Sequence, residues 1–188
     1  MLAPMAKWTP ARADTLEALA REILHNYSRG RVFVAVDGID GAGTVRFAND
    51  LADALRALGS HVVRASMDGF LRAGPDSTAP GSTSAEALYR ESFDYDKFRR
   101  VLAHPFRSGE PREQEQSVPA DAILLVDGVF LNRPELAGLW NYSMWLDSAP
   151  GLAANGPYEA EARPRAAAVA IIDNTAPEHP RRVFADAC

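Results

Sequence analysis

Five short segments of the chain are apolar at nearly every position, and polar residues mark their ends. Runs of this length and composition predict strands that are covered on both faces, as the strands of a parallel sheet are. We therefore expect strands at RVFVAVD (31–37), HVVRAS (61–66), AILLVD (122–127), NYSMWLD (141–147) and VAIIDN (169–174).

The segments between these runs repeat their apolar residues with the period of a helix. An amphipathic helix is expected over 11–28, inside an N-terminal helical segment of residues 1–29, and a second one ends at Gly59. Shorter helical patterns lie near 85–90 and 95–103. Strands that alternate with helices predict an α/β fold with a doubly wound, mostly parallel five-stranded sheet. We expect residues 1–188 to form a single domain.

Composition and charge narrow the expected partners. With 47% hydrophobic and 24% charged residues, the chain has the composition of an ordinary globular protein. The net charge of −5 gives no electrostatic reason to expect nucleic acid, and no apolar run approaches the roughly 18 residues of a membrane span. The one cysteine, Cys188, excludes an intramolecular disulfide and favours a cytoplasmic location. A homodimer would be ordinary for such a domain.

The stretch GIDGAGTVRFA, directly after the first strand, has the pattern of a phosphate-binding loop. Backbone N–H groups at the start of a helix, together with the helix dipole, attract an anion. A nucleotide or another phosphorylated small molecule is the partner that this predicts, although a glycine-rich turn without a ligand is the alternative. The spacing G-x-x-G-x-G is not the dinucleotide fingerprint G-x-G-x-x-G. The candidate phosphate-binding residues are Gly38, Asp40, Gly41, Ala42, Gly43, Thr44, Val45 and Arg46.

The loop departs from the pattern G-x-x-x-x-G-K-S/T at two positions. Thr44 stands at the lysine position and carries no charge, and Val45 stands at the hydroxyl position and cannot ligate a metal. Arg46 lies about 200° around the helix from the lysine position, so its side chain starts on the wrong side to replace that lysine. These changes predict weak or lost phosphoryl transfer.

Five blocks in order resemble the uridine kinase and phosphoribulokinase group of P-loop kinases, and more narrowly the uridine kinase-like proteins of actinobacteria. The blocks cover most of residues 31–177 and read VAVDGIDGAG, ASMDGF, LYRESFDYDKF, LLVDGVFL and IIDNTAP. The resemblance implies the P-loop nucleoside-kinase fold. It also implies an ATP-dependent phosphotransferase that uses ATP and Mg²⁺ and acts on a nucleoside or a small hydroxylated metabolite.

The resemblance also implies roles for single residues. Asp68 matches a general base, and Asp127 matches the acid that orients magnesium, so both are candidate catalytic residues. Asn174 matches a segment that borders the nucleotide base. The residues that match an acceptor-binding block are Phe70, Tyr89, Arg90, Phe93 and Asp94. The structural alternatives are that Asp68 caps the element after the second strand and that Phe93 packs in the core.

The region 148–168 is shorter than the arginine-bearing lid that the resemblance leads us to expect, and it is rich in alanine and proline. Three functions therefore stay open. The chain is a phosphotransferase with weak or lost activity, a catalytically inactive nucleoside- or phosphate-binding or regulatory protein, or an enzyme that uses the kinase pocket for other chemistry.

Overall fold

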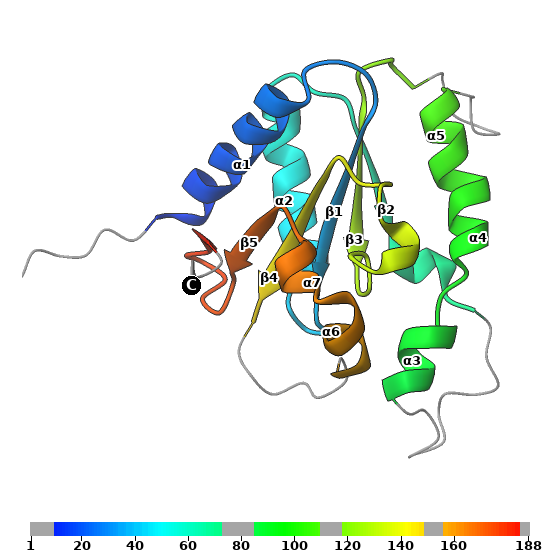
Figure 1. Cartoon of the computed structure of the whole chain (residues 1–188). Helices are drawn as coiled ribbons and strands as arrows, with labels where there is room; N and C mark the ends of the chain where they lie inside the picture. Colours follow the sequence, from blue (N-terminus) through cyan, green and yellow to red (C-terminus); the bar gives the residue numbers. More distant parts are fainter. Residues whose placement is uncertain (1–9, 73–84, 110–117, 149–155, 185–188) are drawn as a thin grey trace, which may run out of the picture.

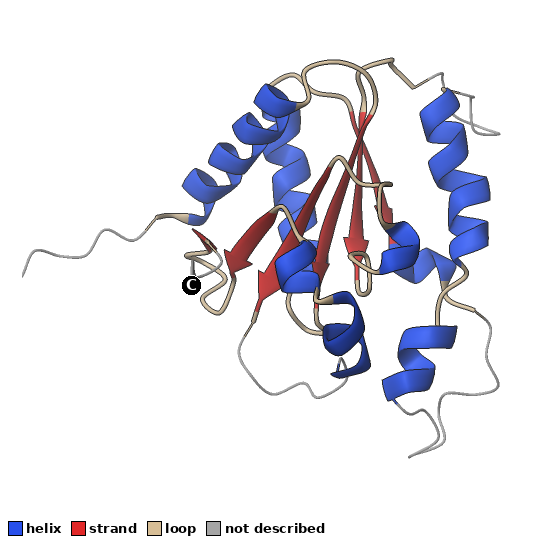
Figure 2. Ribbon diagram, viewed as in Figure 1, coloured by secondary structure: helices blue, strands red, loops and turns tan. Residues whose placement is uncertain are grey.

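The computed structural model describes residues 10–72, 85–109, 118–148 and 156–184. Within these ranges one sheet of six strands runs through the molecule in the order β2-β3-β1-β4-β5-β6 (Figures 1 and 2). The first five strands are parallel to their neighbours, and β6 pairs with β5 in the antiparallel sense. The strands are β1 (Val32–Gly38), β2 (Val62–Ser66), β3 (Ile123–Gly128), β4 (Tyr142–Asp147), β5 (Ala170–Asp173) and β6 (Arg181–Val183).

The predicted α/β fold with a mostly parallel sheet is confirmed, but the predicted count of five strands is one too low. The missed strand, β6, has only three residues, of which two are arginines. Its apolar content is too small to produce a strand pattern, and it forms because its backbone pairs with β5, where Ile171 faces Val183.

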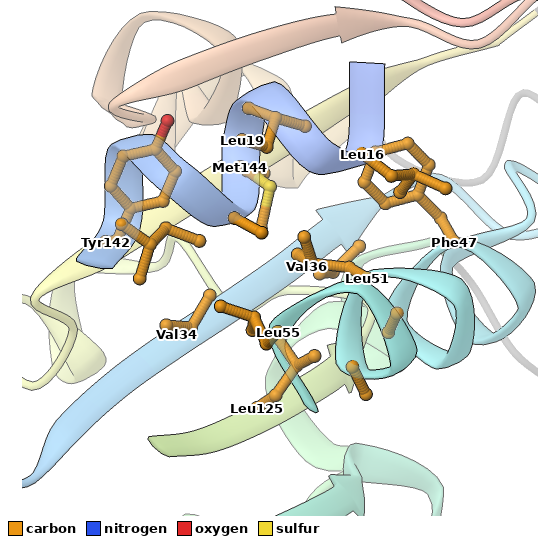
Figure 3. Close-up of a cluster of buried hydrophobic side chains, with 14 of the residues drawn as sticks. Leu16, Leu19, Val34, Val36, Phe47, Leu51, Leu55, Leu125, Tyr142 and Met144 are labelled. Carbon is orange, nitrogen blue, oxygen red and sulfur yellow. The ribbon is translucent and has the colours of Figure 1, made fainter. Parts of the chain in front are cut away.

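Two helices cover one face of the sheet, α1 (Arg12–Asn26) and α2 (Thr44–Ala57) (Figure 1). Both follow the predicted apolar periodicity, and their buried residues meet the inward side chains of β1, β3 and β4. Figure 3 shows these side chains pointing toward one another: Leu16, Leu19, Val34, Val36, Phe47, Leu51, Leu55, Leu125, Tyr142 and Met144.

The opposite face carries a second core that is rich in aromatic residues. Rings of β1 and α5 meet there edge to face, with 5.1 Å between the centroids of Phe33 and Phe106.

None of the helices in the described ranges has the length and apolarity needed to cross a bilayer. The remaining helical elements are η1 (Met67–Phe70), α3 (Ala85–Glu91), α4 (Tyr95–Phe98), η2 (Arg99–Ala103), α5 (His104–Ser108), η3 (Pro134–Leu136), α6 (Gly156–Ala162) and α7 (Pro164–Ala167).

The helix predicted near 95–103 is longer than expected, because α4, η2 and α5 follow one another without a break to Ser108. The middle segment, η2, is a π-helix, and Pro105 comes two residues after it. Proline has no N–H group to donate and clashes with the carbonyl one turn earlier in an α-helix. The wider π turn before Pro105 therefore lets the helix continue past it.

Candidate functional site

The predicted phosphate loop connects the end of β1 to the start of α2. Gly41 and Gly43 have φ angles of +78° and +80°, a left-handed conformation that favours glycine. Gly38 allows the chain to fold back on itself, since a Cβ atom there would lie 2.9 Å from the Cβ of Ala42. The glycines of the motif thus fix the path of the loop.

The start of α2 leaves hydrogen-bond donors unused. Gly43 is the N-cap, no side chain of the described residues caps the helix, and the first turn contains no acidic residue. The N–H groups of Thr44, Val45 and Arg46 have no acceptor within the helix, because their acceptors would precede it. Such donors, at the positive end of the helix dipole, can hold an anion.

A pocket of about 220 Å³ lies in front of this helix start. It brings the loop together with both acids that the sequence proposed as catalytic, since the sheet register places Asp127 next to Ser66, two residues before Asp68. We call this cavity the phosphate-loop pocket, and it is lined by Ile39, Asp40, Gly41, Gly43, Thr44, Val45, Asp68, Asp127, Gly128 and Val129. Lysine and arginine are absent from the described residues that line it.

Asp68 lies in η1 and is exposed to solvent. The cap of that element is Ser66, whose Oγ accepts a hydrogen bond from the Asp68 amide at 3.3 Å. The alternative that Asp68 serves as a cap is therefore wrong. Within the described part of the chain its carboxylate has no hydrogen-bond or ion-pair partner, so it can act on a molecule in the pocket.

Asp127 is 1% exposed and is bound by an arginine that sequence reasoning missed. Arg64, in β2, donates from Nη2 to Asp127 Oδ1, and from Nη1 to the carbonyls of Leu125 (2.7 Å) and Ala65 (3.1 Å). Its Nε and Nη2 also donate to Asn49 Oδ1 of α2, at 3.2 and 3.1 Å. A single basic residue inside the apolar run HVVRAS was the signal that could have found it.

The second carboxylate oxygen of Asp127, Oδ2, is buried and has no hydrogen-bond partner. A magnesium ion is what the kinase fold implies here, but the residues present do not fit it. Val45 offers no oxygen at the metal-ligand position, and Arg64 already neutralises the Asp127 carboxylate. Within the described residues, no three acidic, histidine or cysteine side chains are grouped as metal ligands.

Asn174, predicted to border the nucleotide base, lies behind the loop. It is 5% exposed, and its Nδ2 donates to the carbonyl of Ala42 at 2.8 Å. This contact holds the loop in place, while the predicted contact with a base stays a prediction. Arg46 turns away from the pocket and forms an exposed ion pair with Glu178 at 2.8 Å. It does not supply the missing lysine charge.

The three aromatic residues of the predicted acceptor-binding set lie in the second core. Phe70, Tyr89 and Phe93 are 8, 1 and 4% exposed. The Phe70 ring packs against Phe98, and the Tyr89 ring against Phe130, both with 5.2 Å between centroids. They are not among the described residues that line the phosphate-loop pocket. Their contact with an acceptor remains a prediction, and in this structure they pack.

The two polar members of that set make structural contacts. Arg90 binds Glu86 one turn earlier at 2.8 Å and reaches Glu161, which connects α3 to α6. Asp94 is the N-cap of α4 and accepts a hydrogen bond from the Lys97 amide at 2.8 Å, which lowers the pKa of Asp94. Neither side chain is among the described lining residues of the pocket.

A second buried acid went unnoticed in the sequence, because Asp37 only seemed to end an apolar strand. It is fully buried, and burial raises the pKa of Asp37 to about 6. Its carboxylate accepts hydrogen bonds from Gly38 N (2.9 Å), Asn132 N (2.8 Å), Asn132 Nδ2 (2.9 Å) and the hydroxyl of Tyr158. Tyr158 belongs to α6, so part of the shortened region 148–168 packs in the core next to the loop.

Comparisons with known proteins agree with this architecture. No protein-family profile and no curated protein sequence matches the chain. A solved structure of a possible uridine kinase from Bacillus stearothermophilus superposes with a TM-score of 0.67 at 21% identity, covering 84% of this chain and 97% of that one. A protein from Silicibacter sp. TM1040, described as a fructose transport system kinase, gives a TM-score of 0.52 at 25% identity, covering 74% and 77%. The predicted resemblance is confirmed in its fold: this chain has the fold of the P-loop kinases.

Proposed function

We propose that this chain is a uridine kinase-like protein that binds the phosphate group of a nucleotide or of another phosphorylated small molecule. We further propose that its phosphoryl transfer is weak or lost and that it works in the cytoplasm. One observation carries the proposal. Thr44 and Val45, the first residues of α2, have free amide groups and line the same 220 Å³ pocket as Asp68 and Asp127, but their side chains lack the charge and the metal ligand that transfer needs.

The chemistry of the pocket explains why binding is favoured over turnover. The backbone N–H groups at the start of α2 need no side chain to hold a phosphate. Asp68 can accept the proton of an attacking hydroxyl, which is the task of a general base. Transfer also needs positive charge on the phosphoryl oxygens, and losing one such preorganised group costs on the order of 10²–10³ in rate.

A working phosphotransferase is the second candidate, and the carboxylate of Asp68 is the observation that favours it. Two solved structures with this fold are described as a possible uridine kinase and a fructose transport system kinase. If this chain is a phosphotransferase, we therefore expect its acceptor to be a nucleoside or a sugar. Under this candidate Asp68→Asn abolishes transfer and leaves nucleotide binding unchanged.

The test measures binding first and turnover afterwards. We would titrate the full chain with uridine monophosphate and with ATP by calorimetry, in EDTA and in magnesium, and then assay transfer from ATP to uridine, cytidine and fructose. We expect uridine monophosphate to bind and transfer to be slow or undetectable. Turnover of uridine at the rate of an ordinary kinase would contradict the weak-activity proposal.

A loop variant locates the binding site. Thr44→Asp places a carboxylate at the first residue of α2. There its negative charge interacts favourably with the helix dipole, so the helix stays stable, but it repels a bound anion. We expect this variant to fold and to lose binding of uridine monophosphate. The matched control is Asp53→Asn, on the exposed side of the same helix, which should bind as the natural chain does. Equal binding by Thr44→Asp would place the ligand outside the loop.

A further inference from the structure

The walls of the phosphate-loop pocket differ in their hydrogen-bonding chemistry. The loop side offers backbone donors at the start of α2, and it also carries the exposed acid Asp40. The facing side offers carboxylate acceptors, from the exposed Asp68 and the buried Asp127. A fully deprotonated anion satisfies the donors, but it would place negative oxygen atoms against these carboxylates. A ligand that suits both walls must carry an acceptor and a donor on the same group.

Asp127 makes the requirement for a donor specific. Its Oδ1 is held by Arg64, while its Oδ2 is buried without a partner. The residue itself lines the pocket. A buried carboxylate oxygen without a hydrogen bond costs free energy, so a ligand that donates to it gains affinity. The guanidinium of Arg64 has an acceptor for each of its three nitrogens, so it is a fixed counter-charge rather than a ligand-binding group.

We infer that the pocket binds a phosphate group that still carries a proton, without a metal ion. The P–OH group donates to Oδ2 of Asp127, and the remaining phosphate oxygens accept from the loop amides. Arg64 supplies the positive charge beside Asp127 that a magnesium ion would otherwise supply. This inference rests on the proposed function, and it adds the protonation state of the ligand and its independence from metal.

Sulfate separates this arrangement from an ordinary anion site, because it has the shape of phosphate but carries no proton at neutral pH. We would titrate the full chain at pH 7 in EDTA with inorganic phosphate, uridine monophosphate and sulfate, using calorimetry. We expect phosphate to bind at least about tenfold more tightly than sulfate, since sulfate leaves the Asp127 oxygen unpaired. Added magnesium should change the phosphate affinity by less than about twofold, a difference too small to represent a bound metal contact.

The variant Asp127→Asn tests the hydrogen bond directly. Arg64 can only donate, so the amide oxygen of the new side chain must face Arg64, and its NH₂ group must face the pocket. A donor then replaces the acceptor, and we expect the preference for phosphate over sulfate to fall by about tenfold or more. The matched control is Asp50→Asn, which alters another arginine-bound aspartate of the structure, paired with Arg12 at 2.7 Å and outside the pocket lining. Its preference should equal that of the natural chain.

The outcomes separate the two proposals, and the natural chain alone suffices if Asp127→Asn fails to fold. Equal binding of phosphate and sulfate, or phosphate binding only with magnesium, overturns this inference while the proposed function stands. An unchanged preference in folded Asp127→Asn also overturns it. If neither phosphate nor uridine monophosphate binds in EDTA or in magnesium, the proposed function fails together with the inference.

Discussion

Two loop residues, Thr44 and Val45, distinguish this chain at the scale of single side chains. We predict that Thr44→Lys raises ATP affinity by about tenfold, the effect of one charge-assisted hydrogen bond of about 1.4 kcal/mol, equally in EDTA and in magnesium. Adding Val45→Thr supplies a hydroxyl ligand and should make ATP binding tighter in magnesium than in EDTA. Calorimetry of the single and the double variant checks both effects.

The control for this prediction is Arg46→Gln, since Arg46 pairs with Glu178 outside the pocket. Arg46→Gln should leave ATP affinity unchanged in the natural chain and in the Thr44→Lys variant. If Arg46→Gln instead removed ATP binding from the natural chain, Arg46 would be the cation of the site. The exposed ion pair seen in the structure would then not persist when nucleotide binds.

We predict that the raised pKa of Asp37 makes the free energy of unfolding depend on pH. Its pKa is about 6 in the folded chain, above the usual 3.8, because burial disfavours the charged form. Between these values the folded chain keeps a proton that the unfolded chain has lost. Its contribution to the free energy of unfolding therefore falls by on the order of 3 kcal/mol as pH rises from about 4 to about 6, and is constant above.

Urea unfolding from pH 4 to pH 8 measures this contribution as a difference between chains. Asp37→Asn cannot titrate, so its stability should lack the fall that the natural chain shows. The exposed Asp53→Asn should follow the natural chain throughout the range. Parallel curves for the natural chain and Asp37→Asn would mean that Asp37 stays ionised when buried, held by its four hydrogen bonds.

At the scale of elements, a variant of Phe93 can test whether this residue packs in the core or binds an acceptor. Phe93 follows α3, and its ring packs against the ring of Phe130. It is 4% exposed, and we predict that Phe93→Ala lowers the free energy of unfolding by about 3–5 kcal/mol. The control is Phe184→Ala, because that ring is 76% exposed. Affinity for uridine monophosphate should change little at a temperature where both variants are folded. If Phe93→Ala left the free energy of unfolding nearly unchanged but abolished binding of uridine monophosphate, Phe93 would belong to the acceptor-binding site.

The strands also show how much of the structure could be predicted from the sequence. All five predicted strands are present. Apolar runs that are buried along most of their length explain β1, β3, β4 and β5, while β2 lies at the edge of the sheet and is only partly buried after Val62. The short, arginine-containing β6 has no such run. The position of Asp68 and Asp127 on the same side of the sheet as the phosphate loop could be predicted, because both lie at the carboxyl ends of predicted strands. The single basic residue of the apolar run HVVRAS could have singled out Arg64, but its pairing with Asp127 depends on the parallel register of β2 and β3, which the sequence does not specify.

The order of the strands accounts for the position of the pocket at the scale of the whole molecule. β1 lies inside the sheet, between β3 and β4, and its loop opens at the carboxyl ends of the strands, where α/β sheets bind ligands. Helices α1 and α2 cover one face of β1, and the aromatic core covers the other (Figure 1). The loop is thus anchored to a strand that is buried along its whole length.

This enclosure predicts the pattern of amide hydrogen exchange. Amides of β1 and β3 are paired on both sides of each strand and buried on both faces, so they should exchange only when the whole chain unfolds. Those of β6, a three-residue edge strand, should exchange at least about tenfold faster through local opening. Saturating phosphate stabilises only the folded state and should slow exchange in β1 and β3, but not the local opening of β6. If β6 were slowed as much as β1, the sheet would open as one unit, and the loop would not be held more firmly than the edge.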